Sequence, residues 1–262
     1  MDSKLNITQQ PALVIDIDSD KLSYLIHAQG MKTKMETIAL DNGADMKQAL
    51  ENAVYDTPLL LEDYRSTTIA LHSQHFVVMP AELLPSADQV FRASFSNLDG
   101  ELMTCEVKNT DAAIACDVPR GVTAFLKRTF SNPELLHHLA PLIAYCAAAY
   151  ADDNGCLHIN VTDKEAHIVA TCNSKLQLAN TFPYHSVDDI IYFALAAFKE
   201  CHFDSRADKI LLSGDNELRG TLAERLREWI AFAMPELFPT KALSLGNEAM
   251  SLPFNIIATA IY

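Results

Sequence analysis

Three aspartates follow an apolar run near the start of the chain, in the stretch ALVIDIDSDKL at residues 12–22. Asp16, Asp18 and Asp20 alternate with other residues. Carboxylates grouped in this way could bind a divalent cation or orient water beside a phosphate. The same residue types also favour a turn between two strands. The spacing therefore leaves three interpretations: a calcium loop, a nucleotide site and a hairpin turn.

The calcium interpretation can be tested on spacing alone. The three aspartates match positions one, three and five of an EF-hand loop, but position six is Lys21 instead of Gly and position twelve is His27 instead of Glu. Apolar segments typical of strands flank the acids where an EF-hand has helices. The sequence therefore disfavours a calcium loop.

Two pairs of histidines are close enough in sequence to share a metal: His72 with His75, and His137 with His138. Neither pair has Cys or acidic partners at a spacing known for zinc sites. We expect surface or capping roles for them and predict no metal site. The chain also lacks a P-loop, a G-x-S-x-G elbow and a G-x-G-x-x-G loop after a strand, so no catalytic residue is predicted.

The elements that would position the aspartates form a repeated pattern. Strands are predicted where β-branched and aromatic residues lie between turn formers, and helices where apolar residues recur at helical spacing. The first half reads as strands 13–18, 22–27 and 34–39, a helix within 45–64, and strands 67–71 and 76–80. The second half reads as strands 156–161 and 166–171, a third from Ser174, a helix capped by Ser186 and Asp189, a strand 209–214 and a helix 218–233. Between the halves we expect a strand at 111–119 and helices at 123–130 and 134–150.

This pattern suggests an internal duplication. The turn Ser19-Asp20-Lys21 matches Thr162-Asp163-Lys164 at a shift of 143, and the strand residue Ile69 matches Ile210 at a shift of 141. We therefore predict two related lobes, residues 1–141 and 142–262, the second ending in a C-terminal strand at 254–262.

Composition limits the partners. Lys and Arg number 20 against 34 Asp and Glu, which gives a formal charge of -14 and disfavours nucleic acid. Arg120, Lys127 and Arg128 read as a solvated helix face. The polar N-terminal residues do not resemble a signal peptide, and the apolar stretch 139–151 is too short to span a bilayer. Six cysteines without a C-x-x-C pair indicate buried free thiols. We expect a cytoplasmic protein with no membrane insertion, whose oligomeric state the sequence does not predict.

The duplicated order of three strands, a helix and a strand resembles the actin-like ATPase fold, which is ribonuclease H-like and includes sugar kinases, the Hsp70 nucleotide domain and PilM. Over nearly the whole chain, the stretches VVMPAELL, LANTFPYHSVDDIIYFAL, KILLSGDNELRG and SLPFNIIATAIY resemble an uncharacterised bacterial family of Bacteroidetes, DUF3822. The resemblance implies an α/β protein of two actin-like lobes, each with a mixed sheet that begins with a β-meander.

The resemblance also implies where a nucleotide would bind. In active members the first hairpin turn carries Asp-x-Gly, whose glycine lets backbone amides approach the phosphates. Asp16 and Ser19 could serve in such a turn, but Asp18 stands where the glycine is required. The second hairpin, with Asn160 and Thr162, has neither the acid nor the glycine.

A third element of active members, a glycine pair that contacts adenosine, is reduced here to Gly214 with Asp215 beside it. The degenerate cleft would therefore consist of seven residues: Asp16, Asp18, Ser19, Asn160, Thr162, Gly214 and Asp215. We expect a non-enzymatic actin-like scaffold or pseudo-ATPase that binds an unidentified protein partner and needs no cofactor. PilM-like relatives, which recruit a partner peptide, offer the analogy. The alternative is a nucleotide-binding protein or weak ATPase or kinase that holds ATP and Mg²⁺ through Asp16 and Asp18.

Overall fold

The first lobe is built on a five-stranded sheet. A computed structural model describes residues 10–41, 43–96, 98–151 and 154–262. The prediction that the chain has no signal peptide rests on its N-terminal residues. Residues 1–9 lie outside the described residues. The sheet has the order β3-β2-β1-β4-β8. Its strands are β1 (Ala12–Ile17), β2 (Lys21–His27), β3 (Lys34–Ala39), β4 (Thr67–Leu71) and β8 (Glu134–His137).

The second lobe repeats this sheet. Its order is β11-β10-β9-β12-β13, and its strands are β9 (Cys156–Val161), β10 (Glu165–Cys172), β11 (Lys175–Pro183), β12 (Lys209–Gly214) and β13 (Phe232–Pro235). In each lobe the first three strands form an antiparallel meander, and the last two add in parallel. The predicted α/β architecture of two related lobes is therefore confirmed.

The two hairpins correspond at a different offset from the one that the sequence suggested. The amide of Asp18 donates to the carbonyl of Lys21 at 2.9 Å, and the amide of Thr162 donates to the carbonyl of Glu165 at 2.9 Å. Thr162 and Glu165 lie 144 positions after Asp18 and Lys21, so the shift of 143 was wrong by one residue. The predicted match of Ile69 with Ile210 was wrong too, because β4 and β12 correspond at a shift of 143: Leu71 pairs with Ile17, and Gly214 pairs with Val161.

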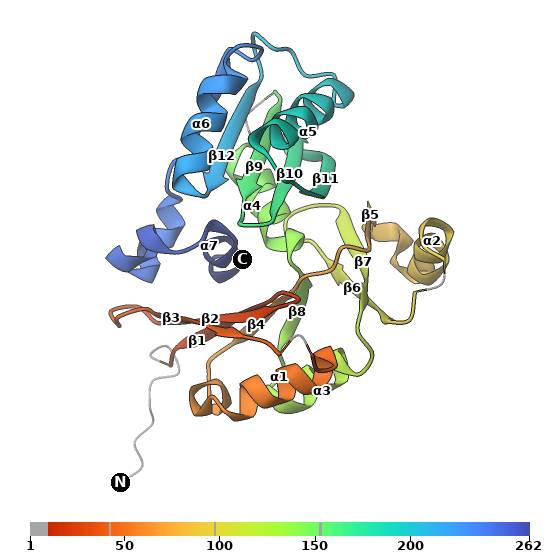
Figure 1. Cartoon of the computed structure of the whole chain (residues 1–262), viewed down its shortest axis with the longest axis vertical. Helices are drawn as coiled ribbons and strands as arrows, with labels where there is room; N and C mark the ends of the chain where they lie inside the picture. The colour runs from red at the N-terminus through yellow and green to blue at the C-terminus, as the bar shows by residue number, and fades with distance from the viewer. Residues whose placement is uncertain (1–9, 42, 97, 152–153) are drawn as a thin grey trace.

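Helices cover the outer face of each sheet (Figure 1). In the first lobe, α1 (Met46–Tyr55) and α3 (Val122–Thr129) bury Leu50, Val54 and Phe125 against the odd-numbered residues of β1. In the second lobe, α5 (Val187–Glu200) and α6 (Asn216–Leu226) do the same for β9. Because alternate strand residues point to opposite faces, the even-numbered residues of β1 and β9 face the space between the lobes.

A smaller sheet lies to the side of the two lobes. Its order is β5-β7-β6, formed by β5 (Phe76–Pro80), β6 (Glu101–Glu106) and β7 (Ala112–Val118), and α2 (Ala87–Ser94) packs on it (Figure 1). The strand predicted at 111–119 and the helix predicted at 123–130 correspond to β7 and α3.

Two helices lie between the lobes, α4 (Leu139–Ala149) and α7 (Phe254–Ala260) (Figure 1). The predicted lobe boundary at residues 141 and 142 falls inside α4, and the division into lobes at that point stays a prediction. The C-terminal strand predicted at 254–262 was wrong, because residues 254–260 form α7. Its apolar residues face both lobes: Ile256 packs on Val14, and Phe254 packs in the cluster around α4. A short helix buried on two sides has no apolar stripe and reads like a strand.

Two other helix predictions were too long for the same reason. Residues 134–150 contain β8 before α4, and residues 218–233 contain most of α6 and the start of β13. The helix predicted within 45–64 is α1, which is followed by a 3-10 helix, Pro58–Leu61. Short buried strands and helix turns have similar apolar composition, so periodicity does not separate them.

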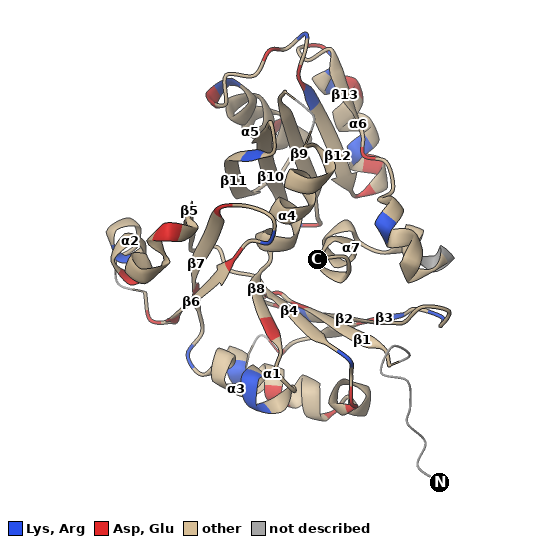
Figure 2. Ribbon diagram, turned by 180° about the vertical axis from the view of Figure 1, so that it is seen from behind, with Lys and Arg blue, Asp and Glu red and all other residues tan. Residues whose placement is uncertain are grey.

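Several surface and cysteine predictions are confirmed. The Ser186 hydroxyl accepts the amide of Asp189 at 3.3 Å, and the Asp189 carboxylate accepts the amide of Ser186 at 2.9 Å, which completes the predicted capping box. Arg120, Lys127 and Arg128 are exposed, and Figure 2 shows the colour of Lys and Arg on α3. All six cysteines are free thiols, four of them buried. Within the described residues, none of the helices has the length and apolarity that a bilayer span requires.

Candidate functional site

A cleft of about 630 Å³ lies between the lobes, at the hairpins β1–β2 and β9–β10. Six of the seven predicted cleft residues line it: Asp16, Asp18, Asn160, Thr162, Gly214 and Asp215. Ser19 does not, because it is exposed at the tip of its turn. The structure therefore brings most of the predicted positions together at one site.

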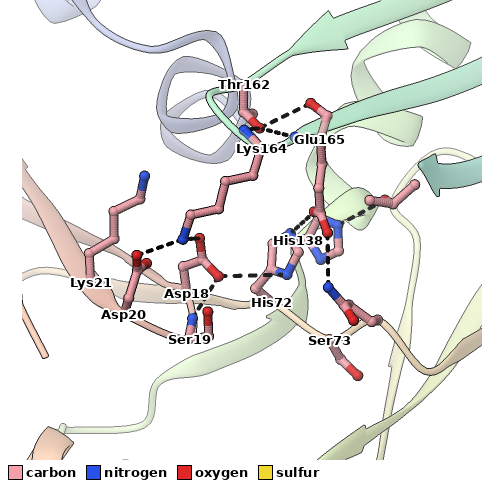
Figure 3. A network of polar contacts seen from close by, with 12 residues as sticks. Asp18, Ser19, Asp20, Lys21, His72, Ser73, His138, Thr162, Lys164 and Glu165 are labelled. Carbon is pink, nitrogen blue, oxygen red and sulfur yellow. Dashed lines mark hydrogen bonds and ion pairs between the residues drawn. The ribbon is translucent and has the colours of Figure 1, made fainter. Parts of the chain in front are cut away.

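Two ion pairs join the hairpin turns across the cleft. Lys21 Nζ lies 3.1 Å from Asp163 Oδ2, and Lys164 Nζ lies 2.6 Å from Asp20 Oδ2. The bond with Lys164 holds the pKa of the Asp20 carboxyl below its usual value, and the bond with Asp20 raises the pKa of Lys164. Each turn thus supplies one lysine and one aspartate to the ion pairs with the other turn. Figure 3 shows the Lys164 side chain reaching from its own turn to Asp20.

Asp18 is held by neighbours from both lobes. One of its oxygens accepts the amide of Ser19 at 2.6 Å, and its carboxylate lies 3.8 Å from Lys164 Nζ and 3.9 Å from His72 Nδ1. In this position Asp18 is part of the cross-lobe polar network (Figure 3). Its carboxylate also occupies the turn where a phosphate-binding member has glycine.

Asp16 is half-buried and faces α7. The side-chain amide of Asn255 donates to Asp16 Oδ2. Burial raises the pKa of Asp16 to about 6, although His72 opposes this shift and the amide of Asn255 does too. Asp16, one of the two carboxylates to which the alternative assigns Mg²⁺, therefore contacts a side chain of the C-terminal helix.

Gly214 and Asp215 have structural roles in the second lobe. Gly214 has φ +92°, and a Cβ at this position would lie 1.9 Å from the carbonyl oxygen of Val161. A glycine is required there by the close approach of β12 to β9. Asp215 caps α6, because its carboxylate accepts the amides of Glu217 at 2.9 Å and Leu218 at 2.8 Å.

Asn160 belongs to a buried polar chain. The Ser213 hydroxyl donates to Asn160 Oδ1 at 2.9 Å and accepts from His158 Nε2 at 2.8 Å. His158 Nδ1 then faces the Tyr150 hydroxyl at 3.3 Å, and Tyr150 donates to Glu236. Burial lowers the pKa of His158 to about 3, so this ring is neutral at neutral pH. The chain satisfies the polar groups on the inner face of the second sheet.

A histidine cluster at the same cleft was not predicted. Nitrogen atoms of His72, His138 and His167 lie within 4.8 Å of one another, and His72 Nε2 lies 2.9 Å from Glu165 Oε2. These residues come from the end of β4, the start of α4 and from β10. No local spacing links them, so the sequence alone carried no signal for the cluster.

The surface roles expected for His137 and His138 were wrong, since both side chains are buried. His137 Nδ1 accepts the amide of Leu139 at 3.3 Å, so the alternative expectation of a capping role holds for this residue. His137 Nε2 bonds the Ser73 carbonyl at 3.1 Å, and burial lowers the pKa of the ring to about 3. The rings of His137 and His138 point in different directions, and the His138 ring lines the cleft.

One protein family accounts for most of the chain. The family model DUF3822, described as a protein of unknown function, matches residues 2–232. The chain belongs to the DUF3822 family. No curated protein matches this DUF3822 chain at a significant level.

Solved structures agree with the fold. The DUF3822 protein is similar to a Bacteroides thetaiotaomicron VPI-5482 protein described as having an actin-like ATPase fold and unknown function. The TM-score is 0.76 at 19% identity, over 98% of this chain and 99% of that one. It is also similar to a chain of the PilM-PilN type IV pilus biogenesis complex, with a TM-score of 0.56 at 14% identity, over 96% of this chain and 98% of that one. At these identities the similarity establishes the actin-like fold alone.

Proposed function

We propose that this DUF3822 protein is a non-enzymatic actin-like scaffold, a pseudo-ATPase whose lobes are held by side chains in place of nucleotide and which acts by binding another protein. The observation that carries this proposal is the pair of ion pairs between the hairpin turns, Lys21 with Asp163 and Lys164 with Asp20. In active members of the fold, these turns are where the phosphates bind.

Electrostatics at the turns supports the absence of phosphate. A phosphate between the hairpins would approach Asp18, Asp20 and Asp163 and would compete with them for the two lysines. Each like-charge contact near 4 Å costs about 1 kcal/mol in water and more where water is excluded. The turn has Asp18 where phosphate binding requires a glycine. Its side chain keeps a phosphate from approaching the backbone amides closely.

The C-terminal helix supports the same conclusion. Asn255 on α7 bonds Asp16, and Ile256 packs against Val14 and Leu25 on the inner face of the first sheet. The helix also contacts the second lobe through Phe254. A segment that packs on both lobes favours one fixed arrangement of them, in contrast to the opening and closing of a nucleotide cycle.

Binding of a protein is proposed by analogy and from the surface. The structural neighbour PilM is, by its description, part of a complex with PilN. At the cleft of this DUF3822 chain, Leu237 is 83% exposed and Met250 is 71% exposed. Isolated exposed apolar side chains are common, but those that gather in one patch mark surfaces that a partner covers, and these two lie at the same cleft. The cytoplasmic location expected from the sequence belongs to the same proposal.

Thermal melting with Mg-ATP tests the absence of nucleotide. We expect no change in Tm, because a ligand that binds only the native state at one hundred times its Kd adds about 2.7 kcal/mol and would raise Tm by several degrees. The matched variant is Asp18→Gly, which restores the turn glycine. A rise in Tm for the unaltered chain would overturn the pseudo-ATPase proposal.

Affinity capture with paired variants tests the scaffold role. The wild type should retain a stoichiometric protein partner from native extract, and the double variant Leu237→Ser with Met250→Ser should lose it. The control is Tyr55→Ser with Leu61→Ser, which changes exposed apolar residues on the far side of the first lobe. Equal retention by both double variants would contradict a partner site at the cleft. Absence of any stoichiometric partner would contradict the scaffold role itself.

One observation favours the alternative, a nucleotide-binding protein or weak ATPase or kinase with ATP and Mg²⁺. The cleft retains about 630 Å³ and is lined by both Asp16 and Asp18. If the alternative holds, Mg-ATP should stabilise the chain, and Asp16→Asn should abolish that stabilisation. The melting experiment above therefore separates the two functions.

A further inference from the structure

We propose that His72, His138 and His167, with Glu165, form a binding site for a first-row transition metal of the zinc type between the two lobes. Neutral imidazole and carboxylate are the ligands that zinc accepts, and four of them complete a tetrahedral site. Such a site would link the lobes whether or not a protein partner binds at the cleft.

The three histidines converge from separate elements, and Glu165 contacts one of them. His72 follows β4 of the first lobe, His138 precedes α4, and His167 and Glu165 lie on β10 of the second lobe. The three ring nitrogens lie within 4.8 Å of one another, and Glu165 already contacts His72 at 2.9 Å. In Figure 3 the side chains of His72, His138 and Glu165 point toward one another.

One ring nitrogen in the cluster lacks a partner. His138 is 8% exposed, and its Nδ1 is buried and makes no hydrogen bond among the described residues. Its other nitrogen, Nε2, bonds the Thr181 hydroxyl at 3.2 Å. With the ring proton on Nε2, the Nδ1 lone pair is directed into the protein and unused. Burial of an unpaired acceptor is costly, and a metal ion would relieve that cost.

Thr181 supplies the outer contact that ligating histidines usually have. Its hydroxyl also lies 3.0 Å from His167 Nδ1, so it contacts one nitrogen of each of two rings. Those bonds would fix the tautomers and leave His138 Nδ1 and His167 Nε2 as the ligand atoms. His167 and Thr181 are directly paired across β10 and β11, which sets this contact.

The protonation states of the rings are compatible with metal binding. Burial lowers the pKa of His138 well below its ordinary value and that of His167 to about 4, so both rings are neutral at neutral pH. For His72, burial lowers the pKa, but the hydrogen bond and charge of Glu165, together with the charges of Asp18 and Asp16, raise it above its ordinary value.

Metal binding requires a local rearrangement. The rings of His72 and His138 are stacked, with centroids 3.8 Å apart and planes at 16°. Zn–N bonds of about 2.0–2.1 Å require ligand nitrogens roughly 3.3 Å apart, so the His72 ring must rotate away from the stack. His72 is intermediate in burial, with 16% of its side chain exposed at the cleft, whereas His138 and His167 are buried.

Zinc and cobalt titrations of the untagged full-length chain test the site. After treatment with a chelator, the protein should bind one equivalent of Zn²⁺, measured by competition with a colorimetric chelator. Co²⁺ in the same site should give the intense visible bands of tetrahedral nitrogen and oxygen ligation. Weak octahedral bands would overturn the proposal, and so would a sulfur-to-cobalt charge-transfer band, which would assign the metal to a cysteine.

Matched variants assign the ligands. His72→Ala and Glu165→Gln should each weaken Zn²⁺ binding by more than about tenfold, because loss of even an outer-shell contact commonly has that effect. Thr181→Val should weaken it less and leave the cobalt spectrum tetrahedral. The control is His185→Ala with His202→Ala, which removes two exposed imidazoles. Melting without metal shows whether each variant is folded, and unchanged affinity in folded His72→Ala would overturn the site.

Discussion

Lys164 Nζ lies 2.6 Å from Asp20 Oδ2, and these two residues occupy equivalent positions of the two hairpins, 144 positions apart. Two copies of the same turn face each other across the cleft. Identical charges at these equivalent positions would repel, whereas opposite charges attract. The opposite charges of Lys164 and Asp20 therefore make the two facing turns a cross-lobe contact.

The Lys164 ion pair should stabilise the native state by a modest amount. Its partners are 45% and 37% exposed at the side chain, so we expect Lys164→Glu to lower the free energy of unfolding by only about 0.5–1 kcal/mol in urea denaturation. The effect should shrink in 1 M salt, where the screening length is about 3 Å. Adding Asp20→Lys to Lys164→Glu should restore much of the loss. A double variant as unstable as the single one would show that the pair does not interact.

Gly214→Ala should be strongly destabilising. The residue has φ +92°, and the added Cβ would meet the Val161 carbonyl at 1.9 Å. We expect a loss of at least about 2 kcal/mol in the free energy of unfolding, from the left-handed backbone together with the displaced strand. The control is Gly220→Ala in α6, where no heavy atom lies within 4 Å and the helix should gain about 0.5–1 kcal/mol. Similar values for both variants would argue against the close approach of β12 and β9.

Asp16→Asn should stabilise the protein at pH 7.5. Burial raises the pKa of Asp16 from 3.8 to about 6, so its protonated form is favoured by folding. That favourable contribution is complete below about pH 4 and is lost as the pH rises through 6. The gain from Asn should be on the order of 1–3 kcal/mol at pH 7.5 and should vanish near pH 4.

Urea denaturation at both pH values checks this behaviour of Asp16. Asp45→Asn, which changes an exposed carboxylate before α1, serves as the control and should show no such dependence. A gain from Asp16→Asn that is equal at both pH values would show that the ionisation of Asp16 is not its cause.

Acid should destabilise the protein through its buried histidines. Burial lowers the pKa of His158 to about 3, whereas in the unfolded chain it is near 6.5. The unfolded state therefore binds more protons between these values, and stability falls as the pH drops through that window, by up to about 1.4 kcal/mol per pH unit for each such ring.

His158→Gln should therefore reduce the slope of unfolding free energy against pH between pH 6 and 4.5. The reduction should be about 1.4 kcal/mol per pH unit, which corresponds to one proton. The slope is the quantity to compare, because the substitution also changes the absolute stability through its bond with Ser213. The exposed His185→Gln should leave the slope as in the wild type. Identical slopes for all three proteins would mean that His158 is protonated in the native state.

The sequence predicted most strands and their repeated order, although not the residue-by-residue correspondence of the halves, because strands and turns depend on local patterns. The meander of 13–39 and its repeat after residue 156 are recognisable from alternating apolar residues and turn formers. The same local patterns failed for α7, for β8 and for β13. Each of these is short and buried by elements distant in sequence, so its apolar residues do not show a single period.

The candidate site, too, was predicted only in part. The resemblance to the actin-like fold placed Asp16, Asp18, Asn160 and Gly214 at one cleft, and all four line it. Sequence reasoning gave no indication of the His72, His138 and His167 cluster, since the three residues share no spacing.

The amino-acid sequence by itself determined that this DUF3822 chain forms two copies of an actin-like lobe and that neither hairpin turn has the glycine needed for phosphate. Only the tertiary structure decided what occupies the space between the lobes: Lys21 and Lys164 paired with the opposite turns, Asn255 against Asp16, and three histidines brought together. The physical reason is that strand patterns and turn chemistry act over a few residues, whereas contacts across the cleft depend on how the two folded lobes pack together.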